Sequence, residues 1–195
     1  MNDVIVHEKR RVFDGFFKVD EATVGYRRAD GSMIGPVRRL SLERGDAVAA
    51  LVFHRDRRSV ILANQFRYPT YDKGPGWLTE LVAGMVDPGE TPEQSMRREI
   101  LEESGYEIER LQHISTFYVS PGGSSGRIFL YYVEVTDANR VGAGGGHGSD
   151  GEDIRLIEVP LDQLRSQVTE GRIADAKTLV AILWFLAVRP ERGRG

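Results

Sequence analysis

The chain has 195 residues, a formal charge of −3 at pH 7 and no cysteine. This length suits one substantial domain, and 41% hydrophobic with 28% charged residues is ordinary for a soluble globular protein. The negative charge argues against a nucleic-acid partner, because no broad positive surface exists to neutralise phosphates, and the lack of cysteine excludes disulfides and thiolate metal sites.

Neither end of the chain carries a recognisable membrane segment. The first residues, MNDVIVHEKRR, lack the apolar run of a signal peptide. The longest apolar stretch, LVAILWFLAV at 179–188, is far shorter than the roughly 20 residues that a membrane span needs. We therefore expect a cytoplasmic protein without a membrane partner.

The first 45 residues are rich in strand-forming sequence. VFDGFFKV (12–19) and ATVGYRR (22–28) precede an Ala-Asp-Gly turn at 29–31, after which VRRLSLE (37–43) resumes a strand pattern. These features predict an N-terminal antiparallel β region over 1–45. The main domain would then cover 46–190, and 191–195 would be a disordered tail.

Strands and helices are mixed along the rest of the chain. AVAALVF (47–53) and SVILANQF (59–66) flank a charged turn and predict a buried hairpin, followed by a loop over 68–76. Further strands are expected at 111–119, 127–135 and 154–159, with a glycine-rich loop at 141–153 and helices at 161–171 and 175–188. This order, without regular βαβ alternation, indicates an α+β (mixed α/β) fold.

The clearest helix is predicted over 92–104. Thr91 suits the N-cap, Pro92 the first helical position, and Gln94 completes a capping box, while Gly105 is the expected stop. At 100° per residue, three glutamates fall within about 100° of arc, beside Arg98. The residues concerned are Glu99, Glu102 and Glu103.

The opposite side of this helix is apolar. Met96, Ile100 and Leu101 would hold it to the core. Like charges four residues apart, near a helix C-terminus, destabilise the helix, and hard divalent cations bound by carboxylates would compensate. The alternative is a solvated charged face, partly paired with Arg97 and Arg98.

The segment GMVDPGETPEQSMRREILEESGY (84–106) resembles the Nudix box, with its fixed glycines, glutamates and Arg-Glu pair. The positions that match are Gly84, Glu90, Arg98, Glu99, Ile100, Glu102, Glu103 and Gly105. Tyr106 stands where the family usually has an aliphatic residue. The resemblance implies a Nudix α/β/α sandwich with the additional N-terminal β region, and Nudix pyrophosphatase activity, which cleaves a diphosphate.

The resemblance also implies a metal site. Glu99 and Glu103 would be the principal ligands of Mg²⁺, for which Mn²⁺ could substitute, and Glu102 would contribute directly or through water. Ala83 would lend its backbone carbonyl. Arg98 would orient the glutamates, and Glu90 would brace the loop.

Outside the box, the chain is similar to nucleoside-diphosphate-sugar pyrophosphatases, which include ADP-ribose and GDP-mannose hydrolases. NQFRYPTYDKGPGWLTELVAGMVDPGE (64–90) and SPGG (120–123) carry this resemblance. It implies that Arg67 contacts a substrate phosphate and that Gly84 lies beside the substrate. The expected reaction is ADP-ribose to AMP and ribose 5-phosphate, with GDP-mannose to GMP and mannose 1-phosphate as the alternative.

The loop GAGGGHGSDGEDI (142–154) is where this branch carries one more acidic residue, which here aligns with Glu152. Glu152 would be an additional metal ligand or the base for the attacking water, and the glycines would let the loop close. Asp150 and Asp153 are neighbouring candidates, and His147 is a weaker one. The AGGG run itself is more similar to GDP-mannose hydrolases.

Two positions depart from both groups of relatives. Gly126 and Leu40 stand where glutamates that recognise substrate are common. A buried polar contact can be worth orders of magnitude in discrimination, so the preferred sugar does not transfer with the resemblance.

The N-terminal strands imply a second subunit, because in this branch they pair between subunits, and we expect a homodimer. Tyr26 and Phe17 could sandwich a base, although for either aromatic alone ordinary sheet packing is the better explanation. Arg38 and Arg39 could contact a phosphate or the partner chain.

Two non-enzymatic readings remain open at this point. One is a Nudix module that senses a nucleotide sugar without cutting it; such modules would be expected to lose the metal glutamates, which are intact here. The other is a structural interaction domain, which leaves the acidic helix face unexplained.

Overall fold

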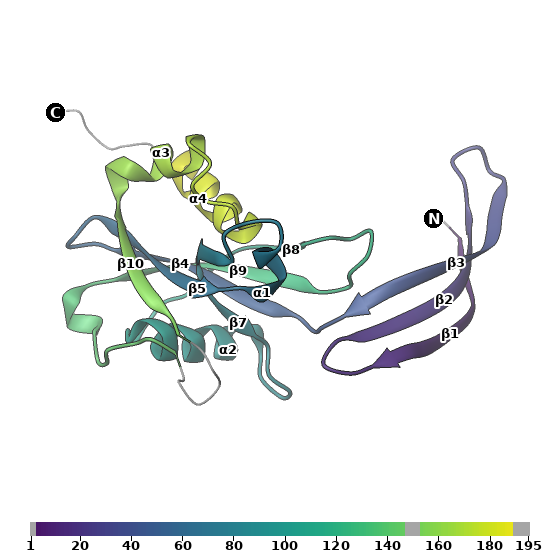
Figure 1. Cartoon of the computed structure of the whole chain (residues 1–195), viewed down its shortest axis with the longest axis horizontal. Helices are drawn as coiled ribbons and strands as arrows, with labels where there is room; N and C mark the ends of the chain where they lie inside the picture. Colours follow the sequence, from purple (N-terminus) through teal and green to yellow (C-terminus); the bar gives the residue numbers. More distant parts are fainter. Residues whose placement is uncertain (1–2, 147–152, 189–195) are drawn as a thin grey trace. The chain divides into compact units, whose positions relative to one another are not determined.

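The computed structural model describes residues 3–146 and 153–188. They divide into two compact units. The first holds the chain up to Asp46 together with Tyr118–Arg127, and the second holds Ala47–Phe117 and the chain from Ile128 onward (Figure 1).

The first unit is built on an antiparallel sheet in the order β1-β2-β3. Its strands are β1 (Val4–Asp14), β2 (Lys18–Arg27) and β3 (Met33–Glu43). Asp14 pairs with Lys18, and the amide of Gly15 donates to the carbonyl of Phe17 at 3.0 Å. The expectation of a strand running through 12–19 was therefore wrong, because the chain reverses there in a tight turn.

The segment 118–127 joins the first unit through β3. The amide of Leu42 donates to the carbonyl of Gly123 at 2.8 Å, and the amide of Ser125 donates back to Leu42 at 3.1 Å. Asp46 and Arg127 add an ion pair at 2.6 Å. The SPGG segment thus belongs with the N-terminal strands although 81 residues separate Gly123 from Leu42 along the chain.

The second unit contains a seven-stranded mixed sheet in the order β10-β5-β4-β9-β8, with β6 paired to β5 and β7 to β4. The strands are β4 (Ala47–His54), β5 (Ser59–Phe66), β6 (Trp77–Glu80), β7 (Val82–Met85), β8 (Gln112–Tyr118), β9 (Arg127–Val135) and β10 (Arg155–Pro160). β4 runs antiparallel to β5 and parallel to β9, so the predicted hairpin over 47–66 is confirmed at the centre of the sheet.

Helices cover both faces of this sheet, α2 on one and α3 with α4 on the other (Figure 1). The helices of this unit are α1 (Tyr68–Tyr71), α2 (Pro92–Glu99), α3 (Leu164–Thr169) and α4 (Ala176–Val188). The short helical turns are η1 (Ile100–Ser104), η2 (Asp137–Asn139) and η4 (Leu161–Gln163). None of the helices in the described part of the chain is long and apolar enough to cross a membrane.

The continuous apolar run of β4 follows from this two-sided burial, since alternate residues serve opposite cores. Leu51 packs with Ile182 and Phe185 of α4. Val52, its neighbour, packs with Met96 and Ile100 on the α2 side. The predicted α+β (mixed α/β) architecture, a layered domain with an added N-terminal antiparallel region, is confirmed.

The acidic helix begins as predicted but does not end as a uniform α-helix. Thr91 and Gln94 form the capping box, and Gly105 closes the helix at φ 74°. Between them, η1 is a wider, π-type turn, which rotates its residues relative to a regular 100° spacing. Met96 and Ile100 are buried as expected, whereas Leu101 is 43% exposed, so its assignment to the core was wrong.

Candidate active site

Arg98 lies at the centre of the acidic residues of the box. Its Nη1 binds Glu99 at 2.8 Å and Glu102 at 3.2 Å, and its Nη2 binds Asp87 at 2.9 Å. Partial burial would lower the pKa of Arg98, but the hydrogen bonds that it donates to Glu90 and Glu99 raise it above its ordinary value. The guanidinium therefore stays charged and offsets the repulsion among carboxylates on one helix.

Glu90 connects the loop before α2 to the same arginine. Its carboxylate accepts from the Ser95 hydroxyl at 2.6 Å and from Nη2 of Arg98 at 3.2 Å. The Ser95 hydrogen bond and the Arg98 contact together lower the pKa of Glu90. These contacts tie the loop before α2 to the helix.

Glu103 points into the protein and not toward Arg98. It is only 4% exposed, and one carboxylate oxygen accepts from the backbone amide of Ala83 at 3.2 Å. Ala83 belongs to β7, so this bond ties the helix that carries the glutamates to the central sheet. The structure thus brings Ala83 and Glu103 together through the amide of Ala83, and not through the carbonyl that was expected to bind a metal.

Gly84 leaves the space that the Glu99 carboxylate fills. A Cβ built at Gly84 would lie 2.0 Å from Cδ of Glu99, far inside van der Waals contact. With any other residue at position 84, the Glu99 carboxylate would have to move. The first glycine of the box therefore acts sterically, by letting a carboxylate lie directly on β7.

The described part of the glycine-rich loop covers the end of the same helix. The amides of Gly145 and Gly146 donate to the carbonyls of Glu103 and Glu102 at 2.8 and 3.2 Å, satisfying groups that a helix end leaves unpaired. A Cβ at Gly144, whose φ is 72°, would lie 2.4 Å from the carbonyl oxygen of Glu103. These glycines permit close backbone contact. From the sequence, they had been expected only to let the loop move.

The donor set suits a hard divalent cation, since it consists of carboxylates on one helix and a backbone carbonyl of the neighbouring strand. Among residues 3–146 and 153–188, no three acidic or histidine side chains are already arranged around one point. Glu99 and Glu102 turn to Arg98 while Glu103 turns to Ala83. The Glu99 carboxylate beside Gly84 and the buried Glu103 carboxylate nevertheless fit such an ion, which would draw their oxygens together.

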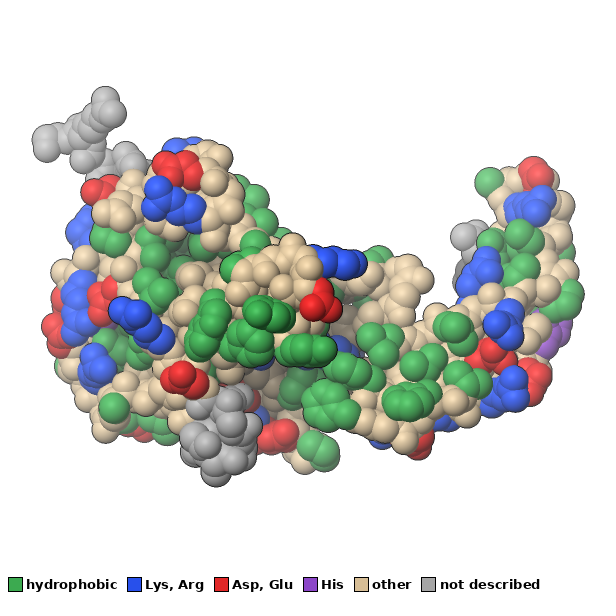
Figure 2. Space-filling model, in the orientation of Figure 1, with side chains coloured by type: hydrophobic (Ala, Val, Ile, Leu, Met, Phe, Trp, Pro, Cys, Tyr) green, Lys and Arg blue, Asp and Glu red, His purple; other side chains and the backbone are tan. Residues whose placement is uncertain are grey.

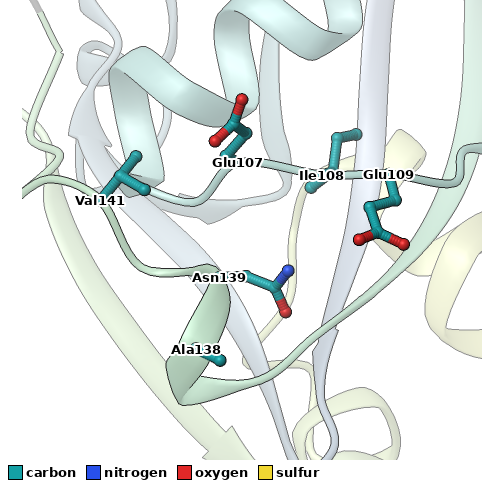
Figure 3. Close-up of a pocket in the computed structure, with 6 residues that line it drawn as sticks. All are labelled: Glu107, Ile108, Glu109, Ala138, Asn139 and Val141. Atoms are coloured by element: carbon teal, nitrogen blue, oxygen red, sulfur yellow. The ribbon is translucent and has the colours of Figure 1, made fainter.

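The remaining candidates fall in different places. Glu152, Asp150 and His147 lie outside the described residues. Asp153 is exposed. A pocket of about 380 Å³ between the segment after η1 and η2 contains none of the predicted site residues (Figure 3). Its lining residues are Glu107, Ile108, Glu109, Ala138, Asn139 and Val141.

Tyr26, Arg38 and Arg39 lie on the sheet of the first unit, where Tyr26 is partly buried. Arg38 pairs with Glu21 at 3.2 Å, and Arg39 donates to the carbonyl of Arg38. As neighbours on β3, their side chains leave opposite faces of the sheet, so one phosphate would meet one of them and not both.

Arg67 follows β5 and binds a carboxylate that the sequence analysis overlooked. Its Nε and Nη2 contact Glu80 at 3.2 and 3.1 Å. Phe66, Tyr71 and Trp77 form an exposed aromatic group beside it, visible as hydrophobic side chains gathered over α1 (Figure 2). A single charge within the apolar run WLTELVAG was the available signal for Glu80.

Comparison with known proteins places these features in context. A family model described as "NUDIX domain" matches residues 43–181. The chain is 37% identical over 185 residues to ADP-ribose pyrophosphatase of Escherichia coli (strain K12), covering 94% of this chain and 88% of that protein. It is 35% identical over 178 residues to GDP-mannose pyrophosphatase of Cronobacter sakazakii, covering 90% and 91%.

A solved structure described as "Crystal structure of ADP compounds hydrolase" superposes with a TM-score of 0.71. The alignment covers 98% of this chain and 97% of that one, at 17% sequence identity. At that identity the likeness supports the fold and not the substrate.

Replacing Gly84 by alanine should displace Glu99, because the new Cβ would collide with its carboxylate. We expect the affinity for Mn²⁺, measured by calorimetric titration, to fall by about tenfold or more with the circular dichroism spectrum unchanged. Gly122→Ala is the matched control, since nothing lies within 4 Å of a Cβ there. Equal Mn²⁺ affinity in both variants would argue against Glu99 as a ligand.

Proposed function

Since this chain belongs to the Nudix family and is a Nudix hydrolase, we propose that it hydrolyses the diphosphate bond of ADP-ribose, releasing AMP and ribose 5-phosphate. The observation that carries this proposal is the intact set of box glutamates within a chain that aligns over 94% of its length with an ADP-ribose pyrophosphatase. The expectation of an enzyme, in preference to a nucleotide-sugar sensor, is confirmed by that family and those relatives.

In this proposal Glu99, Glu102 and Glu103, with the Ala83 carbonyl and Glu152, hold Mg²⁺, for which Mn²⁺ can substitute. Bound divalent ions neutralise the diphosphate and make a bound water more acidic. Among the protein's own groups, Arg98 holds Glu99 and Glu102 on one side of the helix.

The other proposed roles fall on three residues. Glu152 takes a proton from the attacking water or completes the ligand set. Arg67, half-exposed after β5, binds a substrate phosphate with its guanidinium. Gly84 lies beside the substrate and leaves the space for Glu99.

GDP-mannose is the second candidate. It is supported by the 35% identity to a GDP-mannose pyrophosphatase and by the glycine run at 144–146. The bond broken is of the same kind, so the two candidates differ in how base and sugar are recognised. Gly126 and Leu40 lack the carboxylates that relatives of both kinds tend to have there.

A homodimer is the assembly we propose. None of the residues of β1 is buried, and apolar side chains such as Ile5, Phe13 and Phe16 are exposed on the first unit. A three-stranded sheet with so little buried surface is marginal alone, and a second copy would cover it. Light scattering on the eluting protein should give twice the mass of one chain, and a monomer over a wide concentration range would contradict the proposal.

The reaction is tested by incubating the protein with Mg²⁺ and each of ADP-ribose and GDP-mannose, and by separating the products. We expect AMP with ribose 5-phosphate, and a higher kcat/KM for ADP-ribose than for GDP-mannose. A higher value for GDP-mannose would reverse the order of the two candidates. A lack of turnover across a broad panel of nucleoside diphosphate compounds would refute both.

Glu103→Gln should lower kcat by about a hundredfold, because it removes a charged ligand while keeping the shape of the side chain. Glu152→Gln should lower kcat more than it changes KM. Glu107→Gln is the matched control, an exposed glutamate just beyond the same helix. If Glu103→Gln retains the wild-type kcat, the metal assignment is wrong; if Glu152→Gln does, the base or ligand lies at Asp150 or Asp153.

A further inference from the structure

Glu80 is a buried carboxylate between two cations. It ends β6, is 3% exposed, and accepts from Nζ of Lys177 at 2.8 Å as well as from Arg67. Burial alone would raise the pKa of Glu80, but Lys177 and Arg67 hold it below its usual value. The carboxylate is therefore charged at neutral pH, and its burial is offset by two ion pairs.

The contact with Arg67 has a defined geometry. Nε and Nη2 reach the two different oxygens of the carboxylate, at 3.2 and 3.1 Å. A fork of this kind fixes the plane of the guanidinium as well as its distance, which a single bond would not do. The side chain of Arg67 is still 41% exposed, so an anion can approach it from solvent.

The other side of Glu80 is anchored to α4. Lys177 also pairs with Asp175 at 3.0 Å, and Asp175 accepts from the amide of Thr178 in the first turn of the helix. The Thr178 hydroxyl in turn accepts from the buried amide of Leu81 at 2.9 Å. Glu80 is thus held from both directions and has little freedom to follow a moving arginine.

The chain continues from Glu80 directly into β7, the strand beside the glutamates that are proposed to bind the metal. Leu81 links it to β7, whose Ala83 amide binds Glu103 and whose Gly84 receives Glu99. The support of Arg67 and the support of the box glutamates therefore lie on one short stretch of backbone. A shift of that backbone would move both together.

We propose that Glu80 is a positioning residue that acts through Arg67, holding its guanidinium where it meets the substrate diphosphate in register with the box glutamates. This inference rests on the proposed function, in which Arg67 binds a substrate phosphate. Lys177 shares the charge of Glu80 with Arg67, and the exposed part of the Arg67 guanidinium is the part that can meet an anion.

A double-mutant cycle tests the coupling, with kcat and KM for ADP-ribose measured in wild type, Glu80→Gln, Arg67→Ala and the double variant. Each single change should lower kcat/KM by about tenfold or more, because the guanidinium is misplaced or absent. The double variant should be no worse than Arg67→Ala, since Glu80 acts only through it. Losses that multiply, or a wild-type kcat/KM in Glu80→Gln, would overturn the proposal.

Arg67→Lys provides a variant at a half-exposed position, where folding is not at stake. An ammonium keeps the charge but cannot span both oxygens of Glu80, so its kcat/KM should fall close to that of Arg67→Ala. A wild-type value would overturn the positioning role. Glu158→Gln is the matched control, because Glu158 also pairs with an arginine, Arg57, but lies on β10, away from Arg67 in the chain. The kcat/KM of Glu158→Gln should equal that of wild type.

A binding measurement separates this inference from the substrate assignment. Calorimetric titration of inorganic pyrophosphate in the presence of EDTA should show similar losses of affinity in Glu80→Gln and Arg67→Ala. If wild type does not hydrolyse ADP-ribose but these losses occur, the proposed function falls and the positioning role stands. If ADP-ribose is hydrolysed and Glu80→Gln matches wild type in both measurements, the positioning role alone falls.

Discussion

Repulsion among carboxylates gathered on one helix is the constraint on which the site depends. Glu99, Glu102 and Glu103 are crowded near a helix C-terminus, where both their mutual repulsion and the helix dipole oppose them. Arg98 relieves two of them directly, and the amide of Ala83 binds the third. A helix arranged in this way is less stable than a neutral one, and it is suited to receiving a cation that the same oxygens can share.

The central sheet makes this crowding tolerable. β4 is buried on both faces, with α4 packed on one and α2 on the other, so the acidic helix is held by apolar packing and not by its own propensity. The π-type turn of η1 then directs Glu103 inward while Leu101 stays exposed. The amides of Gly145 and Gly146 satisfy the carbonyls at the same end of the helix.

Charge pairing recurs at the end of β6, just before β7. Glu80 is buried between Arg67 and Lys177, and Asp175 continues the alternation of signs into α4. Buried charges are tolerated only when paired, so this network constrains where each member can lie. The network around Arg98 and the network around Glu80 involve different helices. Both are connected to the one stretch of chain that forms β6 and β7.

Local pattern predicted most secondary elements, and the resemblance carried by the box residues implied the reaction class. Some features depend only on neighbours within a few residues and can therefore be predicted from sequence. They are the capping box at Thr91, the helix stop at Gly105 and the spacing of the box glutamates. Only the tertiary structure revealed the turn within 12–19, the wider turn of η1, the close approach of the Glu99 carboxylate to Gly84, and the partners of Glu80. Glu80 and Lys177 are 97 residues apart, and contacts across such separations depend on how the sheet and α4 pack, which no local periodicity encodes.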